Sequence, residues 1–205
     1  MKQNKKLYSF IASFLRPFVK IFFPYKVVGI ENIKNLEGGC IICSNHLSNL
    51  DPVFFVVSCP HYIHFMAKYE LFKNPLLGKF FSAMGAFAVK RGKGDHQAIN
   101  EAENVLKSGE ILGIFIEGTR SKTGEFLRPK SGAALLAATA NVPVVPVCIT
   151  GVSEDKKVHL FKKTVIKYGP VITPEQLGIE EKNRAEIKSA TNLIMTKIKE
   201  LRSEE

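Results

Sequence analysis

The chain has 205 residues and a formal net charge of +10, with 29 lysines and arginines against 19 acidic residues. This length fits one sizeable hydrophobic core, and because no Pro/Gly/Ser-rich linker divides the chain, we expect a single domain. The charge calls for an anionic partner, but the sequence has no zinc-finger spacing, RNA-binding aromatic motif or basic zipper, which argues against nucleic acid. The basic N-terminal end is also the most apolar part of the chain, and this combination fits an anionic membrane surface.

The four cysteines all lie within apolar runs, at positions 40, 43, 59 and 148. Such placement favours reduced, packed thiols in a cytosolic protein over a disulfide framework. Cys40 and Cys43 form a CxxC pair, but on a strand their side chains would point to opposite faces, and no second Cys or His pair completes a zinc site. We therefore expect no metal and no cofactor.

Residues 7–24 form an apolar segment with the spacing of an amphipathic helix. Its polar residues share one helical stripe: Ser9, Ser13, Arg16 and Lys20. Its phenylalanines recur at every fourth position: Phe10, Phe14, Phe18 and Phe22. Charges and a proline inside so short a segment argue against a transmembrane span. We expect residues 1–25 to lie in the membrane interface, peripheral or monotopic on the cytoplasmic face of the cell membrane; a helix buried in the core is the alternative.

After this segment, apolar runs of strand length alternate with helical patterns. The expected strands cover residues 26–30, 39–44, 62–67, 86–89, 110–116, 144–149 and 165–168. The expected helices cover residues 52–58, 70–84 with a break near 74–75, 96–107 capped by Asp95, 131–140 and 180–202. The alternation predicts an α/β fold, a single domain over residues 26–205 with a mostly parallel mixed sheet flanked by helices.

Three polar stretches directly follow expected strands, at residues 45–51, 90–94 and 117–124. Loops that leave the carboxyl ends of parallel strands gather at one edge of the sheet, where α/β folds place their sites. The first stretch contains His46 and Asp51. On a continuous helix a five-residue offset leaves two side chains about 140° apart, so these two can meet only across a turn.

Two interpretations of this pair follow from the stretch alone. In one, Asp51 and Pro52 are the N-cap and first residue of a helix, and His46 is a loop residue without a role. In the other, a turn folds His46 back so that Asp51 orients it as a general base. The chain contains no G-x-S-x-G nucleophile elbow, so such a base would activate a substrate hydroxyl.

Cationic side chains occur in or near the other two loops, next to glycines that let a ligand approach the backbone. They are Lys90 and Arg91, Arg120 and Lys122, and Lys130 a short way beyond. Solvated surface charge is the alternative for each of them. Because no Walker A pattern is present, a phosphomonoester near a membrane fits these loops better than a nucleoside triphosphate.

Four sequence blocks occur in order over about half of the chain: NHLSNLD at 45–51, GAFAVKR at 85–91, FIEGTRS at 115–121 and VPVVPV at 142–147. They resemble the N-H-x-x-x-x-D block and the three following blocks of the glycerolipid acyltransferases, the family that contains 1-acyl-glycerol-3-phosphate (lysophosphatidate) acyltransferase. Ile116 and Ala88 depart from the family pattern, because proline is common at both positions. Each departure removes a fixed φ angle and leaves the charged groups in place.

The resemblance implies that residues 26–205 are an acyltransferase domain. His46, oriented by Asp51, would take the proton from the 2-hydroxyl of lysophosphatidate as that oxygen attacks a thioester of acyl carrier protein or coenzyme A, and the product would be phosphatidate. The residues implied to bind the acceptor are Arg91, Glu117, Gly118, Thr119, Arg120 and Lys130. The residues implied to face the acyl chain or to support the structure are Val142, Pro143 and Pro146.

Three other functions stay open on the sequence. They are acyl transfer to another lysolipid, hydrolysis by an esterase or thioesterase that uses the same pair, and noncatalytic binding of phospholipid headgroups. The four blocks define the chemistry better than the acceptor headgroup, and they do not distinguish the two acyl donors.

Overall fold

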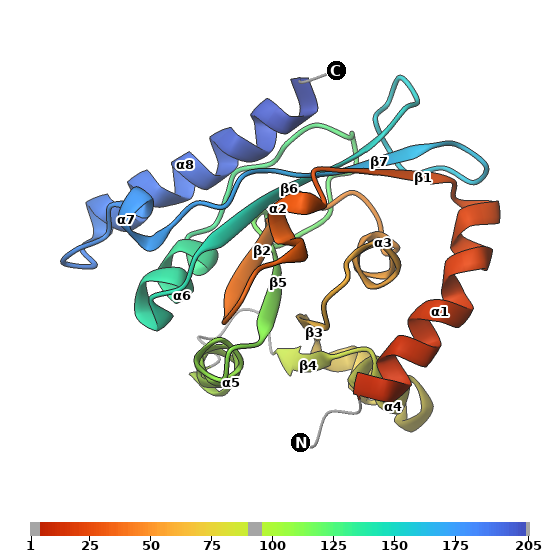
Figure 1. Cartoon of the computed structure of the whole chain (residues 1–205), viewed down its shortest axis with the longest axis horizontal. Helices are drawn as coiled ribbons and strands as arrows, with labels where there is room; N and C mark the ends of the chain where they lie inside the picture. The colour runs from red at the N-terminus through yellow and green to blue at the C-terminus, as the bar shows by residue number, and fades with distance from the viewer. Residues whose placement is uncertain (1–4, 90–95, 204–205) are drawn as a thin grey trace.

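A seven-stranded sheet crosses the computed structural model, which describes residues 5–89 and 96–203 (Figure 1). Its strands are β1 (Tyr25–Val28), β2 (Cys40–Ser44), β3 (Ile63–Lys68), β4 (Ala86–Val89), β5 (Ile111–Phe115), β6 (Val144–Gly151) and β7 (Thr164–Tyr168). They lie in the order β1-β7-β6-β2-β5-β3-β4. Five neighbouring pairs are parallel and β6 with β7 is antiparallel, which confirms the expected mixed, mostly parallel sheet.

Helices cover both faces of this sheet (Figure 1). One face packs against α5 (His96–Lys107), α6 (Gly132–Ala140), α7 (Pro174–Leu177) and α8 (Arg184–Ser203). The other packs against α1 (Lys5–Phe22), α2 (Glu31–Lys34) and α3 (Asp51–Ser58). A 3₁₀ turn, η1 (Tyr69–Phe72), and α4 (Pro75–Ala83) connect β3 to β4. The sequence did not predict the four-residue helices α2 and α7, which are too short to show a helical period.

Strand β2 lies at the centre of the sheet, and all five of its residues are buried. Cys43 faces the core under α5, α6 and α8, whereas Cys40 faces the core under α3, which confirms that the CxxC pair points to opposite sides. All four cysteines are free and buried, and burial raises the pKa of each thiol, that of Cys59 to about 12. Within the described chain, no group of three or more His, Cys, Asp or Glu side chains is arranged to hold a metal ion.

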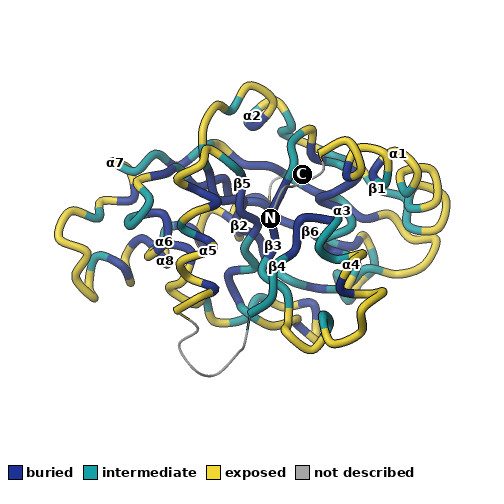
Figure 2. Tube along the Cα trace, turned by 90° about the horizontal axis from the view of Figure 1, so that it is seen from below, coloured by how far each residue is buried: buried dark blue, intermediate teal, exposed yellow. Residues whose placement is uncertain are grey.

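Helix α1 is half embedded in the protein. Tyr8 and Ala12 on its inner face are buried in the core that also holds α3, and Arg16 Nε donates to the carbonyl of Val57 at 3.1 Å. Its phenylalanine row is exposed, from 43% at Phe22 to 69% at Phe10. Figure 2 shows exposed positions along α1. The phenylalanines are therefore not core residues, and their contact with a membrane stays a prediction. No helix in residues 5–89 and 96–203 is long and apolar enough to cross a membrane.

A buried amide fixes the end of β2 against β6. The side chain of Asn45 donates from Nδ2 to the carbonyl of Ile149 and accepts from the N–H of Ile149, both at 2.8 Å. The amide thus continues the pairing of β2 with β6 one residue past Ser44 and sets the exit direction of the next loop.

Asn45→Ala should lower the free energy of unfolding by about 2–6 kcal/mol, because it removes the amide partner of both main-chain groups of buried Ile149, at about 1–3 kcal/mol each. Urea denaturation measures this. Asn100→Ala, at an exposed position on α5, is the matched control and should change stability by less than about 0.5 kcal/mol. Equal stability of the two variants would show that the Asn45 amide is dispensable.

Candidate active site

The two polar loops that the structure describes meet at the carboxyl ends of neighbouring parallel strands. Ser44 is in register with Phe115, so residues 45–51 and 117–124 leave β2 and β5 side by side, as the sequence predicts. The third predicted loop, with Lys90 and Arg91, lies outside the described residues, as does the expected cap Asp95. At Ile116 the backbone N–H donates to the carbonyl of Ser44 at 2.9 Å, a bond that the proline common at this position could not make.

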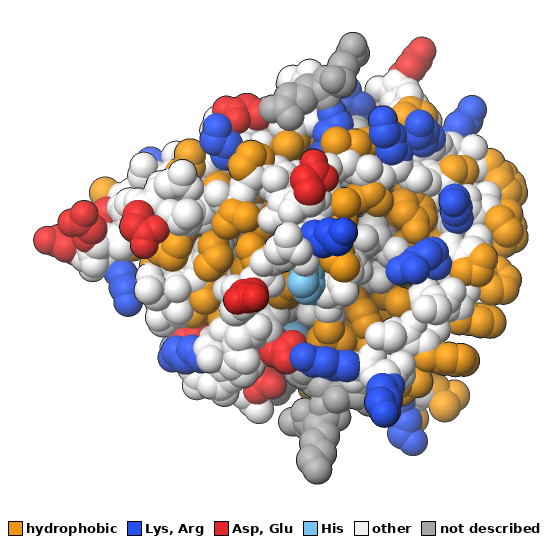
Figure 3. Space-filling view, viewed as in Figure 1, with side chains coloured by type: hydrophobic (Ala, Val, Ile, Leu, Met, Phe, Trp, Pro, Cys, Tyr) orange, Lys and Arg blue, Asp and Glu red, His pale blue; other side chains and the backbone are white. Residues whose placement is uncertain are grey.

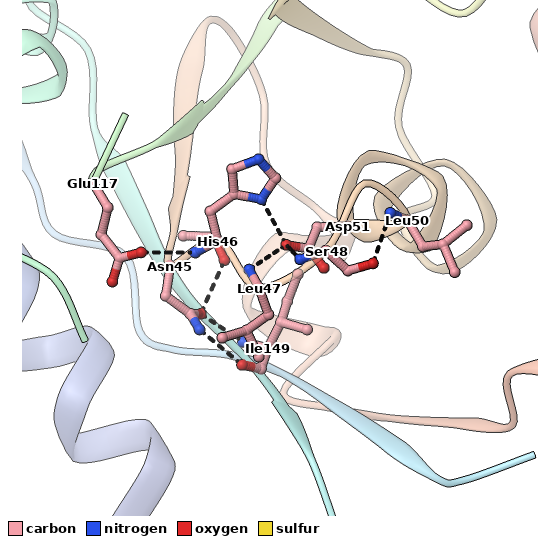
Figure 4. A network of polar contacts seen from close by, with 9 residues as sticks. Asn45, His46, Leu47, Ser48, Leu50, Asp51, Glu117 and Ile149 are labelled. Atoms are coloured by element: carbon pink, nitrogen blue, oxygen red, sulfur yellow. Dashed lines mark hydrogen bonds and ion pairs between the residues drawn. The ribbon is translucent and has the colours of Figure 1, made fainter. Parts of the chain in front are cut away.

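His46 and Asp51 meet across a turn (Figure 4). His46 Nδ1 lies 2.7 Å from Asp51 Oδ2, and the same oxygen accepts the N–H groups of Leu47 and Ser48 at 2.6 and 2.9 Å. The prediction that Asp51 is the N-cap is wrong. Leu50 holds that position without a side-chain cap, because the Asp51 carboxylate is turned back to the preceding turn.

This geometry fixes the tautomer of the histidine. A carboxylate that accepts two backbone N–H groups on one oxygen acts there as an acceptor, so His46 must donate from Nδ1. Nε2 then carries the lone pair, and in Figure 4 it points away from Asp51. Asp51 is fully buried, whereas the His46 side chain is 13% exposed, so the imidazole remains accessible. The pair therefore has the arrangement of a general base with its orienting carboxylate.

The loop after β5 forms hydrogen bonds with both the N–H and the carbonyl of His46. The N–H of His46 donates to Glu117 Oε2 at 3.2 Å, and the N–H of Ser121 donates to the His46 carbonyl at 2.8 Å. Glu117 Oε1 accepts from Leu127 N–H at 2.9 Å, so this buried carboxylate joins both ends of its own loop to the histidine turn. Burial raises the pKa of Glu117, and the two hydrogen bonds oppose that shift.

The predicted acceptor-binding residues in the described chain lie in this loop or beside it. Thr119 and Arg120 are exposed and stand between the two points, Glu117 and Ser121, at which the loop is bound to His46. Gly118 has a φ of +67°, and the Lys130 side chain crosses it so closely that a Cβ there would lie 2.9 Å from Lys130 Cδ. Arg120 thus belongs to the loop that is bound to His46, and the Lys130 side chain lies against Gly118 of the same loop.

The ring of Phe115 stacks on the imidazole of His46. The ring centroids are 4.0 Å apart and the planes differ by 14°. Phe65 stacks behind Phe115 at 6.4 Å, and it occupies space that Gly113 leaves free, because a Cβ at Gly113 would lie 2.3 Å from the Phe65 ring. The sequence analysis did not identify Phe115 as a site residue, although it begins the third block. The stack covers one imidazole face and restricts its rotation.

An apolar cleft of about 360 Å³ opens beside this stack. Its lining includes residues of β3, β4, β5, α5 and α6: Met66, Val89, Ile99, Ile114, Phe115 and Gly132. Gly118 and Lys130 stand at it as well, so the cleft begins next to the cationic loop. The predicted acyl-chain residues do not line it: Val142 and Pro146 are buried, and Pro143 precedes β6. The role of these three residues stays a prediction.

The chain belongs to the Acyltransferase family, whose sequence model matches residues 24–150. It is 36% identical to the 1-acyl-sn-glycerol-3-phosphate acyltransferase of Bacillus subtilis over 78% of this chain and 79% of that protein. It is 32% identical to a chloroplastic 1-acyl-sn-glycerol-3-phosphate acyltransferase of Brassica napus, but there it spans 44% of the relative's length. The crystal structure of the LPA acyltransferase PlsC from Thermotoga maritima shares the fold, with a TM-score of 0.73 and 24% identity over all of this chain and 85% of that one.

Phe115→Leu should lower kcat by about tenfold to a hundredfold with little change in KM, because a freed imidazole spends less time in the reactive orientation. Steady-state kinetics and their pH profile, with an acyl thioester and a lysolipid, measure the effect. Phe87→Leu, which removes a ring from a half-buried position on β4, is the control. An equal fall in kcat for both variants would show that the loss comes from packing rather than from the stack.

Proposed function

We propose that this protein transfers a fatty acyl group from the thioester of acyl carrier protein or coenzyme A to the 2-hydroxyl of 1-acyl-glycerol-3-phosphate, forming phosphatidate. The observation that carries the proposal is the 2.7 Å contact between His46 Nδ1 and Asp51 Oδ2 at the carboxyl edge of the sheet, in a chain of the Acyltransferase family. The names of the relatives from Bacillus subtilis and Brassica napus support the choice of acceptor.

The chemistry follows from the free nitrogen of His46. Nε2 takes the proton of the 2-hydroxyl while that oxygen bonds to the thioester carbon. The carbon–sulfur bond breaks next, the thiol leaves with the proton that the imidazole carries, and the ester remains on the glycerol. Asp51 stabilises the imidazolium between these steps, since its buried carboxylate already holds Nδ1. The reaction needs no cofactor, because the thioester supplies the activated acyl group.

Cations of the β5–α6 loop are assigned to the phosphate of the acceptor. Arg120 is exposed in the part of the loop between Glu117 and Ser121, and the Lys130 side chain crosses Gly118. Both can therefore face a phosphate held near His46. Arg91 keeps its predicted phosphate role by resemblance. Both carboxylate oxygens of Glu117 bind backbone N–H groups, and this arrangement favours a bracing role over direct contact with the acceptor.

The surroundings of the site suit a lipid substrate. The apolar cleft beside Phe115 is assigned to an acyl chain, since it starts next to the base and is lined mostly by apolar side chains. Residues 1–25 are assigned to an anionic membrane at its cytoplasmic face, because α1 exposes four phenylalanines in a chain of net charge +10. Both donors are acidic, so the positive charge suits either.

The decisive assay combines purified protein, a labelled acyl thioester and a panel of lysolipids, with diacyl product and free fatty acid both quantified. We expect diacyl product from lysophosphatidate and thiol release that depends on the acceptor. Equal thiol release without any lysolipid would identify a thioesterase instead. A larger product yield from a different lysolipid would reassign the acceptor.

His46→Ala should lower kcat by about 10²–10⁴-fold, as expected for loss of a general base, while lysophosphatidate binding is retained. His96→Ala, at an exposed position on α5, is the matched control and should be fully active. Retention of normal turnover by His46→Ala would exclude this residue as the base.

Gly132→Leu should shift the preference toward shorter acyl chains. Gly132 lines the cleft, and outside its own turn of helix no atom of the described residues lies within 4 Å of the place where its Cβ would stand, so a leucine side chain can begin there without a clash. Relative kcat/KM for a series of thioesters measures the shift, which we expect to be about tenfold for the longest chains. Gly132→Ala is the control, and an unchanged chain-length profile in Gly132→Leu would separate this cleft from the acyl chain.

A further inference from the structure

Besides the row on α1, exposed apolar side chains lie close together on helix α4 and in the connection between β6 and β7. On α4 they are Leu76, Leu77 and Phe80, and Leu76 is 78% exposed. In the β6–β7 hairpin, residues 152–163, they include Leu160 and Phe161. Monomeric proteins seldom leave clustered apolar side chains of this size in water, so such clusters indicate a contact surface.

The spacing of the apolar residues on helix α4 places three of them on its outer face. Leu76, Leu77 and Phe80 share one helical face, while Phe81 and Phe72 on the inner side pack against each other in the core. Asn74 caps the helix by accepting the N–H groups of Leu76 and Leu77. The outward face therefore belongs to a well-anchored helix with its own core contacts.

The hairpin presents Phe161 in an unfavourable backbone conformation. Its φ is +57°, which is uncommon for a bulky residue, and the side chain is 61% exposed. The N–H of Phe161 donates to the carbonyl of Phe22 at 2.7 Å, and the two rings are 5.8 Å apart. The hairpin thus extends the phenylalanine row of α1 by one ring, at the cost of local strain.

Contacts connect α1 with the hairpin at one end and with residues next to α4 at the other. At the other end of α1, Tyr8 packs on Tyr62 at 4.5 Å, and the Tyr62 ring lies against Gly85, two residues past α4. Figure 1 shows α4 and the amino-terminal end of α1 on the same side of the molecule, and both elements contribute residues to the same core. Figure 3 shows hydrophobic side chains along the edge that α1 forms, with lysines and arginines among them.

The charge of this region selects its partner. Residues 5–22, 75–83 and 160–163 contain no acidic residue. Their exposed lysines include Lys6, Lys20, Lys79, Lys162 and Lys163. The remainder of the hairpin holds two acidic residues, exposed Glu154 and Asp155, and Asp155 is engaged by His159 at 2.8 Å. A second copy of the chain would place these lysines against one another, whereas anionic lipid headgroups would neutralise them while the phenylalanines enter the acyl layer.

We propose that α4, the β6–β7 hairpin and α1 together form a surface that docks on an anionic lipid bilayer. This inference rests on the proposed membrane association and adds two contact elements to it. The three elements would fix the orientation of the protein on the bilayer, which one helix alone leaves free to roll.

Site-specific fluorescence tests the proposal in the full chain. The four native cysteines are buried, so an environment-sensitive nitrobenzoxadiazole label can be attached selectively to Leu76→Cys, Phe161→Cys or Phe14→Cys. Leu135→Cys on α6, exposed to a similar degree as Leu77, is the matched control. With vesicles of phosphatidylcholine and phosphatidylglycerol, we expect a blue shift for the first three labels and none for the control.

The outcomes separate this inference from the proposed membrane association. A shift at Phe14→Cys alone would overturn the three-part surface and leave docking by α1 intact. No shift at any position, together with no cosedimentation of the unlabelled protein, would overturn both. As a second measurement, Leu76→Ser with Phe80→Ser should weaken vesicle binding by about tenfold without loss of thermal stability, and unchanged binding would overturn the role of α4.

Discussion

One oxygen of a buried carboxylate holds the site together. Oδ2 of Asp51 binds the imidazole of His46 and the backbone N–H groups of Leu47 and Ser48, so a single atom fixes the turn, the ring and the start of α3. Because the carboxylate is fully buried, these bonds are strong, and the loss of any donor would leave part of a desolvated charge uncompensated. The five-residue spacing follows from this arrangement, since it is the length of chain needed to return the histidine to the carboxylate.

The strands could be predicted from the sequence because short apolar runs at central positions such as β2 have few alternatives. The turn between His46 and Asp51 could also be predicted, because helical geometry forbids their contact otherwise. The direction of the Asp51 carboxylate could not, because the Asp-Pro pair fits a helix cap equally well. The contacts of Asn45, Glu117 and Phe115 depend on which strands are neighbours, and one sequence does not state that order.

The end of β5 connects the His46 site with the apolar cleft. Alternation along the strand sends Ile114 toward the core under α5 and α6 and Phe115 toward the opposite core. At the carboxyl edge both residues reach the cleft, and there Phe115 also meets His46. An acyl chain lying in the cleft would therefore end next to His46. Helix α1, to which we assign membrane contact, packs on the opposite face of the sheet, so the sheet separates the two proposed lipid contacts.

The burial of the cysteines has a chemical consequence if the acyl donor is a thioester, as proposed. A thioester exchanges its acyl group with any accessible thiolate, so a surface cysteine near the site would be acylated by the enzyme's own substrate. All four thiols are enclosed in the two cores, and burial raises the pKa of each. Under the proposed function, such burial would protect the thiols from acylation by the donor and leave the acceptor hydroxyl as the destination of the acyl group.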